Sequence, residues 1–144
     1  MKQPLTIGFI GLGLIGGSIA KAIRYYYPDT RIIAHTRSQA TIDYALNEQI
    51  IDIACDQVDA RFSECDYIFL CAPVEANASY LEILKPLIQP GCILTDVGST
   101  KTDIHNHVAD LGLVGQFIAG HTMAGSEKTG IANAKRQLLE NAYY

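Results

Sequence analysis

Residues 5–18, LTIGFIGLGLIGGS, decide the fold of this chain. The apolar run at residues 5–10 predicts a fully buried strand, and a helix is expected over Leu14–Tyr26. Three glycines between them make the pattern G-x-G-x-x-G. This pattern is weak by itself, but at the turn between a strand and a helix it is typical of a βαβ unit that binds a dinucleotide.

Each glycine of the pattern has its own expected role. Gly11 permits the tight turn, Gly13 lets the backbone approach a pyrophosphate, and Gly16 lets the helix pack closely on the strand. Free N–H groups and the positive end of the helix dipole then attract phosphate. The cofactor contacts expected here are Gly11, Leu12, Gly13, Leu14, Ile15 and Gly16. The alternative is a glycine-rich packing turn that binds no ligand.

The rest of the chain alternates strands and helices. Five more strands are expected at residues 31–35, 50–54, 66–71, 92–96 and 117–119. Helices are expected at 39–47, with Ile42, Ala45 and Leu46 facing inward, at 76–88 and at 102–111, and helical character at 131–140. Because the strands are apolar without alternation, they predict a mostly parallel sheet covered on both faces. The expected fold is a doubly wound α/β domain of the Rossmann type spanning residues 1–144.

The end of the second strand indicates which nucleotide binds. NAD-binding domains usually have Asp or Glu there, about 20 residues beyond the glycines, to bind the ribose 2′-OH. Here the segment reads His35-Thr36-Arg37-Ser38. Thr36 and Ser38 can donate to a phosphate, and Arg37 can make a charge-assisted contact with it. These residues favour NADP, with NAD and a solvated Arg37 as the alternative.

Ligands of open parallel sheets bind beyond the carboxyl ends of the strands. Ala72, Pro73 and Val74 follow one such end and are expected to contact the cofactor. His121 lies in a glycine-flanked loop after the last expected strand. With a pKa near 6.5, histidine suits a base that takes a hydroxyl proton while a hydride leaves the carbon.

Ser99, after the fifth expected strand, could orient the hydroxyl or the imidazole. The alternative for His121 is a structural loop histidine. Asp96 is equally suited to capping Ser99 or Thr100 and to a catalytic role.

Net charge, cysteine content and the lengths of apolar runs limit the kinds of partner, metal site and location expected for the chain. The net charge of the 144 residues is -4, which argues against nucleic-acid or membrane partners, because both need a basic face. Four cysteines without a C-x-x-C pair indicate buried reduced thiols, and no cluster suggests a metal site. The chain begins with a strand rather than a signal peptide, and no apolar run approaches the ~20 residues of a membrane helix, so a cytoplasmic location is expected.

At four places the sequence resembles the prephenate/arogenate dehydrogenase family of tyrosine biosynthesis. The matching segments are GLGLIGGS at 11–18, FLCAP at 69–73, DVGSTK at 96–101 and GHTMAGSE at 120–127. The first is generic to nucleotide-binding folds, whereas the last two are fairly specific. The likeness covers essentially the whole chain, and Thr122 is a departure because the family usually has proline there.

The resemblance implies oxidative decarboxylation of prephenate or arogenate, with 4-hydroxyphenylpyruvate or tyrosine as product. By motif, His121 corresponds to the base that hydrogen-bonds the ring hydroxyl, and Ser99 to the serine that positions it. The family also has a C-terminal helical domain, which forms a homodimer and supplies cationic contacts to the substrate carboxylates. That domain is absent here, so the chain is expected to be a piece of a longer protein that binds nucleotide but is inactive alone.

Two other functions fit the same glycine motif. One is a β-hydroxyacid dehydrogenase, whose catalytic lysine would lie on a later helix. The other is a regulatory domain that senses NAD(P) without catalysis, which would have no need of the GHTMAGSE loop.

Overall fold

Within residues 4–98, 102–120 and 129–139, which the computed structural model describes, six parallel strands form one sheet in the order β3-β2-β1-β4-β5-β6. The strands are β1 (Thr6–Ile10), β2 (Arg31–His35), β3 (Ile53–Cys55), β4 (Tyr67–Leu70), β5 (Ile93–Asp96) and β6 (Phe117–Ile118). The chain moves outward from β1 to β3 and then crosses back to β4. The carboxyl ends of β1 and β4 therefore meet at the point where ligands of such sheets bind.

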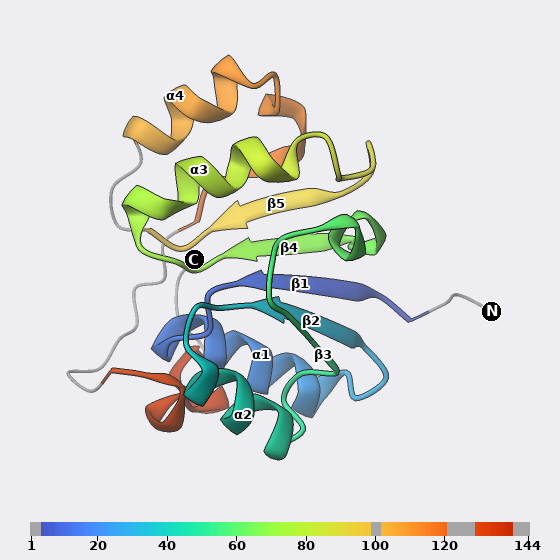
Figure 1. Cartoon of the computed structure of the whole chain (residues 1–144), viewed down its shortest axis with the longest axis vertical. Helices are drawn as coiled ribbons and strands as arrows, with labels where there is room; N and C mark the ends of the chain where they lie inside the picture. The colour runs from blue at the N-terminus through green and yellow to red at the C-terminus, as the bar shows by residue number, and fades with distance from the viewer. Residues whose placement is uncertain (1–3, 99–101, 121–128, 140–144) are drawn as a thin grey trace.

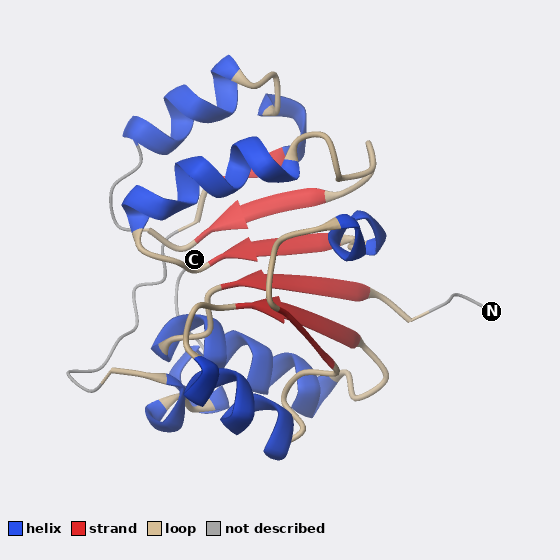
Figure 2. Ribbon diagram, in the orientation of Figure 1, coloured by secondary structure: helices blue, strands red, loops and turns tan. Residues whose placement is uncertain are grey.

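Helices cover both faces of the sheet, as Figures 1 and 2 show. On one face lie α1 (Leu14–Tyr26) and α2 (Gln39–Asn47), and on the other α3 (Val74–Leu84) and α4 (Thr102–Asp110). Short 3-10 helices are η1 (Ala60–Glu64), η2 (Val114–Gln116), η3 (Ile131–Asn133) and η4 (Arg136–Leu139). The arrangement confirms the doubly wound α/β fold of the Rossmann type.

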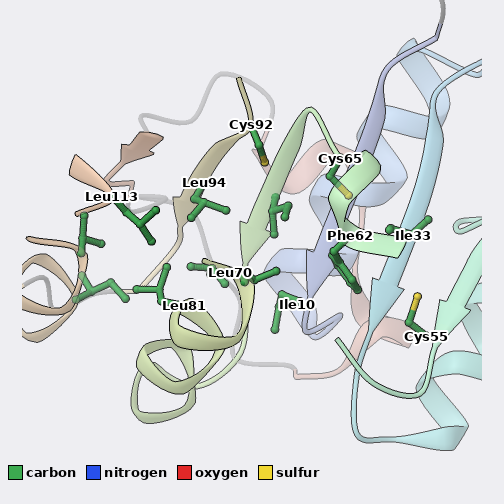
Figure 3. Packing of buried hydrophobic residues seen from close by; sticks show 14 residues of the cluster. Ile10, Ile33, Cys55, Phe62, Cys65, Leu70, Leu81, Cys92, Leu94 and Leu113 are labelled. Atoms are coloured by element: carbon green, nitrogen blue, oxygen red, sulfur yellow. The ribbon is translucent and has the colours of Figure 1, made fainter. Parts of the chain in front are cut away.

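Alternate residues of each central strand enter two separate cores. Ile10, Leu70 and Leu94 face α3 and α4, in the cluster drawn in Figure 3. Phe9 faces α1 and α2, where its ring stacks on Phe69 with centroids 5.2 Å apart. Burial on both faces is why these strands are continuously apolar in sequence.

The third strand begins later than expected. It was predicted at residues 50–54 but spans Ile53–Cys55. Ile50 and Ile51 are buried all the same, and both of their N–H groups donate to the carbonyl of Ala45 at the end of α2. Their apolar character therefore reflects packing in a turn, which a short apolar run cannot distinguish from a strand.

The segment predicted as helical at residues 131–140 is not an α-helix. It forms η3 and η4, with extended backbone at Ala134 between them. The Lys135 N–H donates to the Ser18 hydroxyl at 3.1 Å, and the Lys21 ammonium donates to the Ala134 carbonyl at 2.6 Å. These contacts with α1 replace the hydrogen bonds that would continue a helix, and local sequence gives no sign of them.

Two details of the helices also differ. The α3 helix spans Val74–Leu84 instead of residues 76–88, because Pro73 precedes its first turn and Pro86 lacks the N–H needed to continue it. Leu46 was expected to face inward but is 41% exposed, whereas Ile42 and Ala45 are buried as predicted.

Candidate functional site

A cleft of about 620 Å³ opens beyond the carboxyl ends of β1, β2 and β4. Its walls come from the turn after β1, the end of β2 and the start of α3. The lining residues are Gly11, Leu12, Gly13, His35, Thr36, Arg37, Cys71, Ala72, Pro73, Glu75, Ala76, Ser79 and Tyr80. The fold thus brings three segments that the sequence suggested separately to a single cleft.

Two of the three glycines, Gly11 and Gly16, have no room for a side chain. Gly11 has a φ of +94°, a left-handed conformation, and a Cβ there would lie 2.8 Å from the carbonyl of Cys71 and the nitrogen of Ala72. A Cβ on Gly16 would lie 2.6 Å from the carbonyl oxygen of Gly11. Real Cβ atoms do not approach other atoms so closely. These two glycines therefore let β1, α1 and the β4–α3 turn meet.

The start of α1 suits an anion. Its N-cap is Gly13, so no side-chain hydrogen bond caps the helix, and its first turn contains no acidic residue. A Cβ on Gly13 would meet no described atom within 4 Å, so the space in front of it is open. Leu14 and Ile15 belong to this first turn, whose backbone N–H groups have no intrahelical partner. Amides and open space together fit a pyrophosphate.

The three polar residues after β2 lie in different surroundings. Thr36 and the exposed Arg37 line the cleft. Arg37 makes no ion pair with another residue of the described part of the chain. Ser38 is the N-cap of α2, and its hydroxyl accepts from the Thr41 N–H at 3.2 Å. Its role as a cap is compatible with an anion bound in front of the same helix end.

Sequence reasoning missed the α3 side of the cleft. Glu75, Ala76, Ser79 and Tyr80 all line it. They are spaced four residues apart in two pairs, on one face of a helix that begins directly at a strand end. That spacing was a usable signal, although finding it required the correct start of α3.

His35 joins two walls of the cleft. Its Nδ1 lies 3.0 Å from the Cys55 carbonyl, which can only accept, so Nδ1 carries the proton. Its Nε2 lies 3.4 Å from the Tyr80 hydroxyl, which then donates to it. Through this pair the end of β2 is connected to α3. In the sequence, His35 stood out only as the first residue of the segment that ends the second strand.

Ser99 and His121, the residues predicted to act on the substrate, lie outside the described residues, but the residue before each is described. Gly98 precedes Ser99 and Gly120 precedes His121. The backbone N–H groups of both glycines donate to the carboxylate of Asp96, at 3.2 and 3.3 Å. Asp96 is 1% exposed. The carboxyl ends of β5 and β6 are thus joined by one buried side chain.

The chain returns to α1 after residue 128. Ile131 and Ala134 pack against Gly17, where a Cβ would lie 2.9 and 3.1 Å from their side chains. Ser18 is fully buried, accepts from the Lys135 N–H and donates to the Leu14 carbonyl at 2.6 Å. The segment that contains His121 is therefore flanked by an attachment to Asp96 and an attachment to α1.

The cysteines are free thiols, as the sequence predicted. Burial raises the pKa of Cys92 to about 11, with a smaller contribution from the charge of Asp66. Cys71 lines the cleft with part of its surface, yet burial of its thiol also raises its pKa far above the ordinary value, and the charge of Asp96 adds to this. Both sulfurs are therefore neutral packing groups.

A second cavity of about 660 Å³ lies between α1, α2 and residues 134–137, away from the strand ends. The two basic side chains at its α1 wall, Lys21 and Arg24, already bind other groups of the protein. Lys21 donates to the Ala134 carbonyl, and Arg24 pairs with Asp52 at 2.7 Å. The cleft at the strand ends is therefore the better match to a nucleotide site.

The described ranges contain neither a metal-binding cluster nor a membrane-spanning helix. Among these residues, no group of three or more His, Cys, Asp or Glu side chains could hold a metal ion. No helix in this part of the chain is long and apolar enough to cross a membrane.

Comparison with known proteins agrees with the geometry. Residues 19–144 match the family described as prephenate dehydrogenase, nucleotide-binding domain. The prephenate dehydrogenase of Bacillus subtilis is 42% identical over 142 residues, which are 96% of this chain and 38% of that protein.

Two solved structures are similar over 96% of this chain and 48% of theirs. The arogenate dehydrogenase of Synechocystis has a TM-score of 0.86 at 36% identity. The prephenate dehydrogenase of A. aeolicus, in complex with hydroxyphenyl propionate and NAD+, has a TM-score of 0.88 at 26% identity. The chain spans less than half the length of these relatives. With a strand-end cleft, a glycine turn and a family match over most of its length, this chain belongs to the prephenate dehydrogenase family, in which it corresponds to the nucleotide-binding domain.

Proposed function

We propose that the protein containing this domain catalyses the NAD(P)-dependent oxidative decarboxylation of prephenate or arogenate, in tyrosine biosynthesis. The main support is the cleft where the carboxyl ends of β1 and β4 meet, in a member of this family. Gly11, Gly13 and Arg37 lie in the walls of this cleft. The similar proteins include a prephenate and an arogenate dehydrogenase. Those relatives are more than twice as long as the matched region, and we propose that a further domain of the full-length protein forms the dimer and recognises the substrate carboxylates.

The residues of the cleft fit a nicotinamide dinucleotide. The pyrophosphate would bind at the uncapped start of α1, in the open space before Gly13. Gly11 and Leu12 would lie beneath it, Gly16 lets α1 pack against that turn, and Ala72, Pro73 and Val74, which follow β4, are proposed to contact the cofactor. A nicotinamide bound there would supply the acceptor for the hydride of the substrate carbon.

His121 is proposed to take the proton of the ring hydroxyl, and Ser99 to hold that hydroxyl in position. The proton moves to an imidazole nitrogen as the hydride leaves the substrate carbon, and it returns to the phenolate oxygen after carbon dioxide has left and the ring has become aromatic. The other proposed site residues bind and orient the dinucleotide. This division predicts that loss of His121 affects turnover and leaves nucleotide binding intact.

The test is His121→Asn in the full-length protein, assayed with prephenate and with arogenate. We expect turnover to be lost while calorimetry shows unchanged nucleotide affinity. His107→Asn, on α4, is the matched control and should remain active. Wild-type protein without activity on either substrate would contradict the proposal, and so would full activity of His121→Asn.

We propose NADP as the preferred cofactor, with the 2′-phosphate contacted by Thr36, Arg37 and Ser38. Supporting this are Arg37, which lies in the cleft wall and forms no ion pair within the described residues, and a first turn of α2 without acidic residues. NADP+ should bind at least tenfold tighter than NAD+, which corresponds to about 1.4 kcal/mol.

Arg37→Ala should remove that difference by weakening NADP+ binding alone, while Lys85→Ala, beyond α3, should change neither affinity. Equal or tighter binding of NAD+ to the unmodified protein would show that Arg37 faces solvent and that NAD is the cofactor.

A further inference from the structure

The strand ladder between β5 and β6 stops before the two segments predicted to act on the substrate. Its last pair is Thr95 with Ile118. Gly98 and Gly120 both lie beyond this pair, and each immediately precedes one of the two predicted active residues. Among the described residues, backbone pairing between β5 and β6 therefore ends before both glycines.

The Asp96 carboxylate connects these segments where the ladder ends. Its Oδ2 accepts from the Gly98 N–H at 3.2 Å, and its Oδ1 accepts from the Gly120 N–H at 3.3 Å. Each oxygen thus serves a different segment. Because the side chain is 1% exposed, water does not compete for these bonds as it would at the surface.

We propose that Asp96 is a positioning residue, whose carboxylate holds the residue before Ser99 and the residue before His121 at a set distance from each other. This inference rests on the proposed function, because it needs Ser99 and His121 to act together on one substrate. Asp96 acts on the reaction through these two neighbours. The loops at the carboxyl edge of the sheet are thus held at three places: at the glycine turn, at Asp96, and where residues 131–135 contact α1.

The two hydrogen bonds that Asp96 accepts from Gly98 and Gly120, here called the bridge, require a carboxylate. Two N–H donors converge on the side chain, and a carboxylate has an acceptor oxygen for each. Asparagine has nearly the same size but only one carbonyl oxygen, so one glycine N–H would face the donors of an NH₂ group. Asp96→Asn therefore breaks one side of the bridge while it preserves the packing.

The experiment uses the full-length protein with Asp96→Asn. We expect kcat to fall by about a hundredfold, the loss typical of reacting groups displaced by about 1 Å. The nucleotide dissociation constant should stay within about twofold of wild type, since the glycine turn is untouched. Val108→Ala, a buried change on α4 outside both segments, should lower stability and leave kcat unchanged.

Hydrogen exchange supplies a second measurement. In the unmodified protein the Gly98 and Gly120 amides should exchange slowly, although they lie beyond the ladder. In Asp96→Asn, peptides covering both glycines should lose protection together. Rapid exchange of either amide in the unmodified protein would overturn the bridge, even if the variant failed to fold.

The two proposals fail in different ways. If Asp96→Asn keeps the wild-type kcat while His121→Asn is inactive, the positioning role is wrong and the proposed function stands. If both variants turn over normally, the assignment of His121 as the base is wrong, and the positioning role is overturned with it. A loss of kcat in Asp96→Asn with unchanged nucleotide affinity supports both.

Discussion

The glycine turn after β1 and the junction between β5 and β6 both fix loops at the carboxyl edge of the sheet, but they do so by opposite means. The turn has no side chains at its contact points, and a Cβ on Gly16 would lie 2.6 Å from the Gly11 carbonyl oxygen. The junction depends on the Asp96 side chain, whose two oxygens accept from two backbone N–H groups.

This contrast indicates which kind of substitution should disrupt each region. The turn is a close approach of backbone segments, so it should be sensitive to added volume. The junction is a pair of hydrogen bonds in a buried place, so it should be sensitive to the loss of an acceptor at constant volume. Substitutions that change volume or hydrogen bonding separately can therefore distinguish the two regions.

The largest effect is expected from Gly16→Val. Overpacking at such a site costs about 1–3 kcal/mol, and displacement of the Gly11 turn should abolish nucleotide binding. Urea unfolding and calorimetry of the purified chain would measure both effects. Gly115→Ala is the control, because a Cβ there meets no described atom within 4 Å, and its stability should change by less than about 0.5 kcal/mol. Normal nucleotide affinity in Gly16→Val would show that the turn tolerates volume.

An intermediate effect is expected where the chain returns from the junction to the glycine helix. Ser18→Ala leaves the Lys135 N–H without its acceptor and should cost about 1–3 kcal/mol, because the site is buried. Ser63→Ala removes a hydroxyl that donates to the Ala60 carbonyl at an exposed position, and should cost less than about 0.5 kcal/mol. Equal losses in urea unfolding would mean that burial of Ser18 does not matter.

The smallest effect concerns the sulfur of Cys92, which directly precedes β5, whereas Asp96 ends that strand. The folded pKa of Cys92, about 11, lies above its ordinary value of 9.0. The unfolded chain therefore loses this proton first as pH rises, and stability should fall between pH 9 and 11, by about 1 kcal/mol at pH 10. Urea unfolding at pH 8 and pH 10 should show a smaller alkaline loss in Cys92→Ala than in wild type. The same loss in both proteins would exclude Cys92 as its source.

Sequence patterns predicted the glycine side of the site well and the junction poorly. Gly11, Gly13 and Gly16 act within one turn, so their spacing describes the geometry directly. The contacts of Asp96 with Gly98 and Gly120 join two segments that are distant in sequence, and no local pattern reports them. The cleft residue Glu75 was missed because the helix was expected to begin at residue 76, two residues after its actual start at Val74.

By itself, the sequence determined the parallel α/β fold, the edge of the sheet where the cleft lies, and the family. These follow from local features: continuous apolar strands, a glycine spacing, and short motifs at strand ends. The tertiary structure alone decided that residues 131–139 form two short 3-10 helices instead of an α-helix, and that Asp96 joins two loops. Both outcomes depend on hydrogen-bond partners far away in sequence, Ser18 in one case and Gly120 in the other. A buried polar group must find a partner wherever the fold supplies one, and that partner is known only once the chain is folded.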